Sequence, residues 1–242
     1  MEDTRLVIVA DAHLGAAPVG DEEAFLRFLD TVPRPGDTLL LVGDIFDYWF
    51  SYRRVIPRRN FRVAAALTTL ARRLPVAMVG GNHDRWGDTF WDVDAGVRFD
   101  PHRLRLPGPG GDALMIHGDG LHEERPGASW MHRATSSPTV IALYRLLPPD
   151  LGFWIADKMG HNLGYAETHP EAVQAAADRQ RRWATATLER ERDLRAVIMG
   201  HTHREALLEV APGRWYLNPG AWLDGWRYAT LDASGAALHQ FS

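Results

Sequence analysis

Short apolar runs recur along the first half of the chain and again near its end. Residues 6–10, 38–42, 76–80, 113–117 and 196–200 form such runs, rich in Val, Ile, Leu and Ala. Runs of about five residues without polar alternation are typical of strands buried on both faces of a sheet. Three later runs, at 215–217, 226–231 and 237–241, are separated by Gly-rich turns, which predicts antiparallel strands.

Two segments between the early runs have the period of an amphipathic helix. Phe25, Phe28 and Leu29 repeat at helical spacing within residues 22–30, and apolar residues recur in the same way over residues 61–73. Strands that alternate with helices indicate a layered α/β domain.

Residues 118–192 interrupt this alternation, because they contain no convincing strand. The first part of this segment is strongly apolar, and in the second part Thr168 and Glu171 form a capping box ahead of another helix. We therefore predict a single domain over residues 1–242, with a helical cap insertion at residues 118–192.

The composition limits the chemistry that can be expected. The chain has no Cys, which excludes disulfides and thiolate metal sites and makes a cytoplasmic location the expectation. We see no signal peptide at the N-terminus and no apolar run near the roughly 18 residues of a membrane span. A net charge of −4 argues against a nucleic-acid partner. The oligomeric state is left open.

Polar side chains follow five of the apolar runs, at the point where each predicted strand ends. The Gly-Gly-Asn-His-Asp stretch alone is explained by turn chemistry. Five such sites in order favour a shared site instead, because ligands gather outside the carboxyl ends of strands in α/β sheets. The polar residues are Asp11, His13, Asp44, Asp47, Asn82, His83, Asp84, His117, His201 and His203.

Seven of these residues are suitable metal ligands. One structural zinc ion takes about four ligands, so seven donors suit two divalent ions that share a carboxylate and leave positions open for water. Oxygen and nitrogen donors without sulfur favour Mn²⁺, Fe²⁺ or Zn²⁺, and we expect Mn²⁺ first. The seven residues are Asp11, His13, Asp44, Asn82, His117, His201 and His203.

The order of the motifs resembles that of the calcineurin-like metallophosphoesterases. Asp-x-His, Gly-Asp-x-x-Asp, Gly-Asn-His-Asp, a lone His after a strand, and Gly-His-x-His follow one another over residues 11–203. The resemblance implies a four-layer α/β/β/α sandwich in which a water or hydroxide between two metals is the nucleophile. It implies a first metal held by Asp11, His13, Asp44 and His203, and a second held by Asp44, Asn82, His117 and His201.

The resemblance also suggests roles for the residues beside the ligands. It implies that His83 faces the substrate, where it stabilises phosphoryl oxygens or protonates the leaving group. We expect Asp84 to orient His83 by accepting a hydrogen bond from its ring. Asp47 is expected to support the site from behind the ligands without binding metal.

Two stretches, "GDIFDYWF" and "YLNPGAW", and the position of the insertion resemble the UDP-2,3-diacylglucosamine diphosphatases of lipid A biosynthesis. Enzymes of that group cleave a nucleotide-linked glycolipid to UMP and an acylated sugar phosphate beneath a helical cap. The chain departs from the group at His83, where its members carry Arg. The alternative is a generic metallophosphoesterase acting on nucleotides, cyclic nucleotides or other small phosphodiesters. A non-catalytic scaffold would be expected to have lost ligands, and all seven are present.

Further residues are candidates for contact with such a substrate. Arg53, Arg54 and Arg204 lie close in sequence to predicted ligands, so they are candidates for binding a diphosphate or anionic headgroups. The alternative for these arginines is an exposed basic surface. Apolar residues within 140–155 either pack on the core, bind acyl chains, or make peripheral contact with the cytoplasmic face of the inner membrane. From that stretch we select Leu147, Phe153 and Trp154 as substrate-binding candidates.

Overall fold

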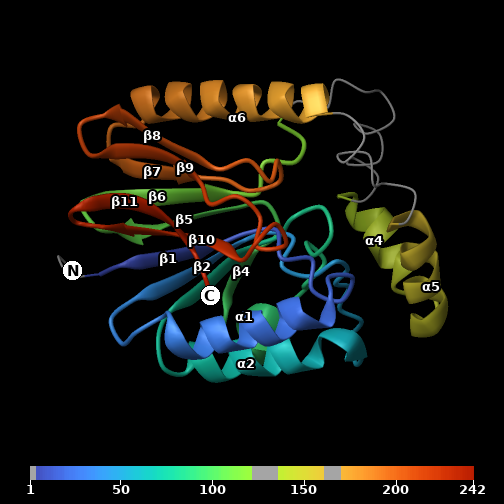
Figure 1. Ribbon diagram of the computed structural model, residues 1–242. Coiled ribbons are helices and arrows are strands. Elements are labelled where there is room, and N and C mark those ends of the chain that lie inside the picture. The colour runs from blue at the N-terminus through green and yellow to red at the C-terminus, as the bar shows by residue number, and fades with distance from the viewer. Residues whose placement is uncertain (1–3, 122–135, 161–169) are drawn as a thin grey trace.

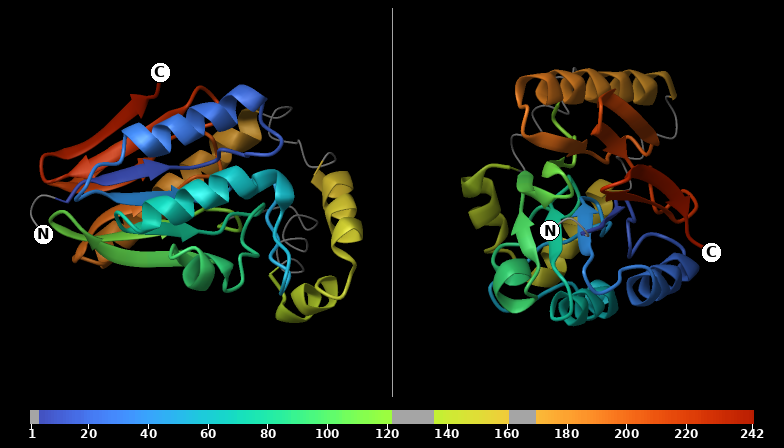
Figure 2. Two further views of the ribbon diagram at one scale, coloured as in Figure 1. Left: turned by 90° about the horizontal axis from the view of Figure 1, so that it is seen from below. Right: turned by 90° about the vertical axis from the view of Figure 1, so that its left-hand side faces the viewer.

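Two β-sheets packed face to face, with helices on their outer sides, form the body of the protein (Figures 1 and 2). The computed structural model describes residues 4–121, 136–160 and 170–242. The layers follow one another as helices, sheet, sheet and helix, which confirms the predicted α/β/β/α sandwich.

Six strands form the first sheet: β1 (Leu6–Val9), β2 (Thr38–Val42), β3 (Val76–Val79), β4 (Arg98–Asp100), β10 (Arg227–Asp232) and β11 (Gly235–Gln240). Their order across the sheet is β11-β10-β1-β2-β3-β4. The neighbours β1, β2, β3 and β4 run parallel, whereas β10 and β11 pair antiparallel at the other side.

Five strands form the second sheet: β5 (Arg103–Gly108), β6 (Gly111–Ile116), β7 (Leu194–Ile198), β8 (Ala206–Ala211) and β9 (Arg214–Asn218). Their order is β5-β6-β7-β9-β8, with β6, β7 and β9 parallel and the two edge strands antiparallel to their neighbours. The central strands of this sheet therefore also deliver their following residues to a common edge.

Helices cover the outer face of each sheet. The first sheet carries α1 (Val19–Thr31) and α2 (Phe61–Ala71), together with the 3-10 helix η1 (Arg58–Asn60) and the π-helix η2 (Phe90–Asp94). The second sheet carries α6 (Pro170–Arg190). In Figure 1, α4 (Pro138–Tyr144) and α5 (Pro149–Gly160) stand beside the sandwich, at the end where β1 and β2 finish.

Alternate residues of the central strand β1 face two different cores. Val7 and Val9 pack with α1 and α2, whereas Leu6 and Ile8 pack between the two sheets. Both faces of the strand are therefore buried, which explains why its sequence is apolar without polar alternation. A third core lies between α6 and the second sheet.

Most predicted elements are confirmed within one to three residues of the predicted bounds. The strands β4, β5 and β8 were not predicted from the sequence. In β5 the signal was an alternation, because Leu104 and Leu106 are buried and the residues on either side of each are exposed. Trp226, predicted to begin a strand, lies at a positive φ of 59° just before β10. The predicted capping-box residue Thr168 lies outside the described residues.

The segment predicted as one helical cap contains two kinds of helix. Ala184 and Leu188 of α6 are buried against the second sheet, so this helix belongs to the sandwich. The helices α4 and α5 lie apart from the layers. The predicted cap role therefore stays a prediction for these two helices. Among the helices in the described parts of the chain, none has both the length and the apolar character needed to cross a bilayer.

Candidate metal centre

The predicted ligands follow the carboxyl ends of the parallel strands and meet there. Within the described residues, three groups of three have ligand atoms that all lie within 4.8 Å of one another; two of the groups consist of predicted ligands alone, and the other joins His13 and Asp44 to His83. Such spacing is suitable for donors around a single ion. The first group is Asp11, His13 and His203, and the second is Asp44, His117 and His201.

The backbone adopts an unusual conformation at most of these residues. Seven non-glycine residues have positive φ within the part of the chain that the structure describes, and five of them are predicted ligands. This left-handed region is rarely used by residues with a Cβ, and it persists where the surroundings hold it and where function needs it. The five are Asp11, His13, Asp44, His201 and His203, with φ between 45° and 71°.

Glycines beside the ligands leave room for their side chains. Gly43 has a φ of 77°, and a Cβ at this position would collide with the imidazole of His117. A Cβ on Gly81 would collide with the carboxylate of Asp44. The glycines of the Gly-Asp and Gly-Gly-Asn motifs therefore allow the backbone to approach the ligands closely.

Two buried atoms of predicted ligands are short of partners among the described residues: Asn82 Oδ1 has no hydrogen-bond partner, and His117 Nε2 has only the carboxylate of Asp44 close to it. The other ring nitrogen of His117, Nδ1, lies 2.9 Å from the carbonyl of Val42, which leaves Nε2 facing Asp44 Oδ2 at 3.1 Å. Buried polar atoms that are short of partners are costly, and a divalent cation would satisfy both of these. The donor set therefore fits a metal.

The pKa values of two predicted ligand imidazoles suit metal binding, whereas for His117 burial is outweighed by the carboxylate of Asp44, which raises the pKa well above its usual value. Burial lowers the pKa of His13 to about 3 and that of His201 to about 4. Both rings are therefore neutral at pH 7, which is the form that coordinates metal. Burial raises the pKa of Asp11 to about 6. Burial also opposes ionisation of Asp44, but the imidazole of His117 and its neighbours bring the pKa of Asp44 well below its usual value.

Asp84 joins two ligand loops instead of orienting His83. Its Oδ1 accepts hydrogen bonds from the N–H groups of Asp44, at 3.1 Å, and Gly81, at 2.8 Å. Its Oδ2 accepts from the two residues after Asp44, at 2.8 and 3.3 Å. A carboxylate offers about four acceptor positions, and these four bonds use them. The prediction that Asp84 accepts a hydrogen bond from the His83 ring is therefore wrong.

His83 lies against the ligands and takes its orientation from Asp47. Its Nδ1 lies 2.6 Å from the carbonyl oxygen of Asp47, and its backbone N–H donates to Asp44 Oδ1 at 2.8 Å. Burial alone would lower the pKa of His83, but the carboxylate of Asp44 and the carbonyl of Asp47 raise it above its usual value. The ring of His83 is 4.8 Å from that of His13, so it faces the same space as the ligands.

The Asp47 carboxylate lies close to two imidazoles, and its supporting role stays a prediction. Its Oδ1 is 3.9 Å from His13 Nδ1 and 3.8 Å from His83 Nδ1. Asp47 is not a member of any group of three, so the structure places it next to the centre without giving it a ligand position.

Supporting residues that the sequence analysis missed hold the Gly-His-x-His loop. Gln180 Nε2 and Asn218 Nδ2 both donate to the carbonyl of Gly200, at 3.1 and 3.0 Å. Asn218 belongs to the "YLNPGAW" stretch, which in the sequence showed a resemblance to a family but gave no role for this residue. A further carboxylate, Asp224, lies 3.4 Å from Nδ1 of His203.

A buried ion pair between Arg85 and Asp119 connects the loops after β3 and β6. Arg85 Nε also donates to the carbonyl of Gly81 at 3.0 Å, and Nη1 donates to Ser136 Oγ at 3.2 Å. The same arginine therefore contacts a ligand loop and the residues just before α4. Its role could not be predicted from the sequence, because its ion-pair partner is 34 residues away.

Aromatic side chains connect α4 and α5 to the loop after β2. The hydroxyl of Tyr48 donates to that of Tyr144 at 3.0 Å, and the rings of Tyr48 and Phe153 are 5.7 Å apart. Leu147 and Phe153 are half-buried in this arrangement. The apolar residues that remain exposed on the two helices and the turn between them are Val140, Leu143, Leu146, Leu151 and Trp154.

The arginines selected from the sequence lie outside the two ligand groups. Arg53 and Arg54 line a cavity of 220 Å³ together with Tyr52 and Asp88. None of the predicted ligands lines that cavity, so the structure does not bring these arginines into the centre. Arg204 follows His203 and is exposed.

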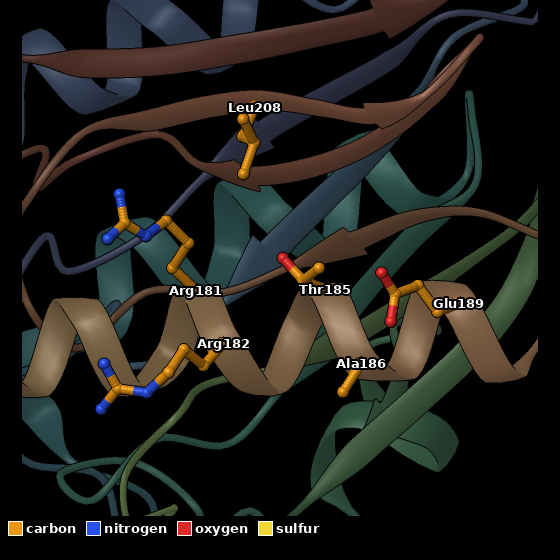
Figure 3. Close-up of a pocket in the computed structure, with 6 residues that line it drawn as sticks. All are labelled: Arg181, Arg182, Thr185, Ala186, Glu189 and Leu208. Atoms are coloured by element: carbon orange, nitrogen blue, oxygen red, sulfur yellow. The ribbon is translucent and has the colours of Figure 1, made fainter.

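A second hollow lies between α6 and β8 and contains no predicted ligand. Its volume is 400 Å³, and in Figure 3 Thr185 of the helix points toward the side of Leu208, whereas Ala186 points away from it. It is lined by Arg181, Arg182, Thr185, Ala186, Glu189 and Leu208. The metal chemistry and this groove therefore occupy different parts of the surface.

Comparisons with known proteins agree with this geometry. The sequence profile of the family described as Calcineurin-like phosphoesterase matches residues 4–205. A UDP-2,3-diacylglucosamine hydrolase of Shewanella sp. (strain ANA-3) is 28% identical over 235 residues, which cover 97% of this chain and 96% of the relative. The enzyme of the same description from Sodalis glossinidius is 28% identical over 248 residues and covers 98% of both chains.

Solved structures with a similar arrangement have low sequence identity. Vps29 of Chaetomium thermophilum is 12% identical with a TM-score of 0.49, over 98% of this chain and 88% of that one. YfcE, a phosphoesterase from E. coli, is 14% identical with a TM-score of 0.46, over 98% and 100% of the two chains.

Proposed function

The chain belongs to the calcineurin-like phosphoesterase family, and we propose that it hydrolyses the pyrophosphate of a UDP-diacylglucosamine-type lipid with two metal ions. The products would be UMP and an acylated sugar 1-phosphate. The observation that carries the two-metal part is the pair of donor groups that meet at the strand ends, each with ligand atoms within 4.8 Å. The buried side-chain oxygen of Asn82, which has no hydrogen-bond partner among the described residues, supports it.

The donor groups suggest how the chain would divide its ligands. Asp11, His13 and His203 would hold one ion, and Asn82, His117 and His201 the other, with Asp44 shared between them. When bound, two divalent cations, Mn²⁺ in our proposal, supply an activated water and neutralise charge on the phosphoryl oxygens.

His83 is the residue we assign to the phosphoryl group. Its Nδ1 is engaged by the carbonyl of Asp47, so Nε2 is the ring atom left for the substrate. The raised pKa of this imidazole favours a protonated ring that can donate a proton to the leaving oxygen or stabilise negative charge. Asp84 contributes by fixing the loops that carry Asp44 and Asn82.

The lipid substrate is supported by two separate observations. The relatives that match nearly the whole chain are described as UDP-2,3-diacylglucosamine hydrolases. The exposed apolar residues of α4 and α5 stand beside the end of the sandwich where the ligands meet, so they offer a surface for acyl chains (Figure 1). Each CH₂ group removed from water contributes about 0.8 kcal/mol, which makes such a surface useful to a diacylated substrate.

A substrate panel tests this proposal. The purified protein with Mn²⁺ is assayed against UDP-2,3-diacylglucosamine, UDP-N-acetylglucosamine, cyclic nucleotides and bis-p-nitrophenyl phosphate. We expect the highest kcat/KM for the diacylated substrate and release of UMP. Efficient cleavage of soluble phosphodiesters with no release of UMP from the lipid would instead establish a generic metallophosphoesterase.

A further inference from the structure

The loop after β9 folds back onto the first group of ligands. Trp222, in this loop, is fully buried, with its ring 5.2 Å from Phe25 and 5.0 Å from Phe28 of α1. The backbone N–H of Trp222 donates to the carbonyl of Ala10 at 3.0 Å, and the backbone N–H of Leu223 donates to the carbonyl of Asp11 at 3.2 Å. The loop is therefore anchored both in the core and on the backbone of a predicted ligand.

This anchored loop presents Asp224 to His203. The two ring nitrogens of His203 face two different carboxylates: Nε2 lies 3.6 Å from Asp11 Oδ1, and Nδ1 lies 3.4 Å from Asp224 Oδ2. Nε2 is thus the nitrogen that faces the candidate metal centre, and Nδ1, on the other side of the ring, faces the carboxylate of Asp224.

The second group of ligands has a comparable arrangement. His117 also turns Nε2 toward a carboxylate, that of Asp44, while its Nδ1 meets the carbonyl of Val42. Histidines that bind metal usually donate their other N–H to an oxygen, which fixes the ring and strengthens it as a ligand. Asp224 would provide for His203 the oxygen that Val42 provides for His117.

Arg227, which contacts the backbone of Asp224, does not explain the position of the Asp224 carboxylate. Arg227 donates from Nε to the backbone carbonyl of Asp224 at 3.2 Å, and its guanidinium pairs with Glu205. The Asp224 side chain is 54% exposed, and an exposed ion pair with an imidazole contributes little to stability by itself. A structural role thus explains the contact poorly.

We propose that Asp224 is a positioning residue that orients His203 toward the first metal ion, an inference that rests on the proposed two-metal function. The carboxylate holds Nδ1–H, so that the ring cannot turn Nε2 away from the centre. Removing it should weaken one ion and leave the other unchanged, because the second ligand group has no contact with this loop among those described.

Titration of the metal-free protein with Mn²⁺ tests this without any turnover. We expect Asp224→Ala to bind one of two ions about 10–100-fold more weakly than wild type, the usual effect of losing such a partner. Asp224→Glu should recover most of the affinity. Asp30→Ala, which removes an exposed carboxylate from α1, should bind both ions normally.

The outcomes separate this inference from the proposed function. If wild type binds two ions and folded Asp224→Ala binds both with unchanged affinity, the positioning role is refuted and the two-metal proposal stands. If wild type binds fewer than two ions, the proposed function itself fails. Circular dichroism and the unfolding temperature verify that each variant is folded, and equal weakening of both ions would point to a general loss of structure and overturn the inference.

Discussion

The ligand edge buries its charged side chains, whereas the α4–α5 pair exposes its apolar ones. At the strand ends, Asp11, Asp44 and His117 have almost no contact with solvent. On α4, α5 and the turn between them, Leu143, Leu146 and Trp154 are 61%, 79% and 58% exposed. Both arrangements oppose the usual partition of side chains, one by burying charge and the other by leaving hydrocarbon in water.

Both arrangements cost free energy on folding, and the protein offsets that cost only for the buried charges. The buried carboxylate of Asp84 receives four backbone N–H bonds, and that of Asp119 pairs with Arg85, so the edge is stabilised from within the protein. Nothing among the described residues covers the exposed face of α4 and α5. The edge is thus satisfied by the protein itself, whereas in our proposal the acyl chains of the substrate would cover the helical pair.

The largest effect should come from removing the shared carboxylate. Asp44→Ala removes the donor that our proposal shares between the two ions, so we expect complete loss of phosphoesterase activity and a lower metal content by elemental analysis. Asp30→Ala serves as the control, because it removes a carboxylate from an exposed helix position. A variant that retained full activity with a single bound ion would refute the proposal that two metal ions bind at the strand ends.

His83 separates chemistry from metal binding within the same edge. His83→Ala should retain both ions and lose roughly 10²–10⁴ in kcat, the usual contribution of a positioned acid or base. His102→Ala, which removes an exposed imidazole ahead of β5, is the matched control. Wild-type turnover in the variant would exclude the assigned role, and loss of metal would make His83 a ligand.

Arg85 tests how the edge stabilises its buried charge. Arg85→Met removes the guanidinium that pairs with the buried carboxylate of Asp119, and we expect a loss of about 3–5 kcal/mol in the free energy of unfolding, measured in urea. The double variant Arg85→Met, Asp119→Leu should recover part of that loss, because the carboxylate is removed together with the guanidinium. Equal stability of wild type and the single variant would contradict the importance of this pair.

The smallest effect should come from the exposed side of α4–α5. Leu146→Glu and Trp154→Glu should lower kcat/KM for the diacylated substrate roughly tenfold, since burying such a side chain contributes about 1.5–3 kcal/mol. Turnover of bis-p-nitrophenyl phosphate should not change. Val93→Glu, at a 74% exposed position of η2, should affect neither substrate. If kcat/KM fell equally for the diacylated substrate and for bis-p-nitrophenyl phosphate, these helices would not be an acyl-binding surface.

The ligand set could be predicted because its signal is local. Asp11, Asp44 and His117 each follow an apolar run directly, and parallel strands bring their carboxyl ends together whatever lies between them. The partners of these residues could not be predicted in the same way. Asp84 pairs with backbone groups some 38 to 40 residues away in sequence, and Asp224 reaches His203 through a loop whose course depends on the burial of Trp222.

The fold was predictable to a similar extent and for similar reasons. Apolar runs and helical periodicity specify which segments are buried, so the central strands and α1 and α2 could be located. Short strands such as β4, and the π-helix η2, depend on packing and have no period of their own. The separate positions of α6 and the α4–α5 pair also required the structure, because apolar residues on a helix do not say which surface will cover them.

The left-handed backbone at five predicted ligands restricts how this lineage can change. Asp and His tolerate that conformation only at some cost, roughly 1–2 kcal/mol for a typical residue with a Cβ, and glycine adopts it freely. On the proposed two-metal function, the need for ligands is what keeps side chains at positions such as 11, 44 and 201. A descendant freed from catalysis would gain stability by placing glycine there. Glycine at these positions in a related sequence would then mark a protein that has abandoned the reaction and kept the fold.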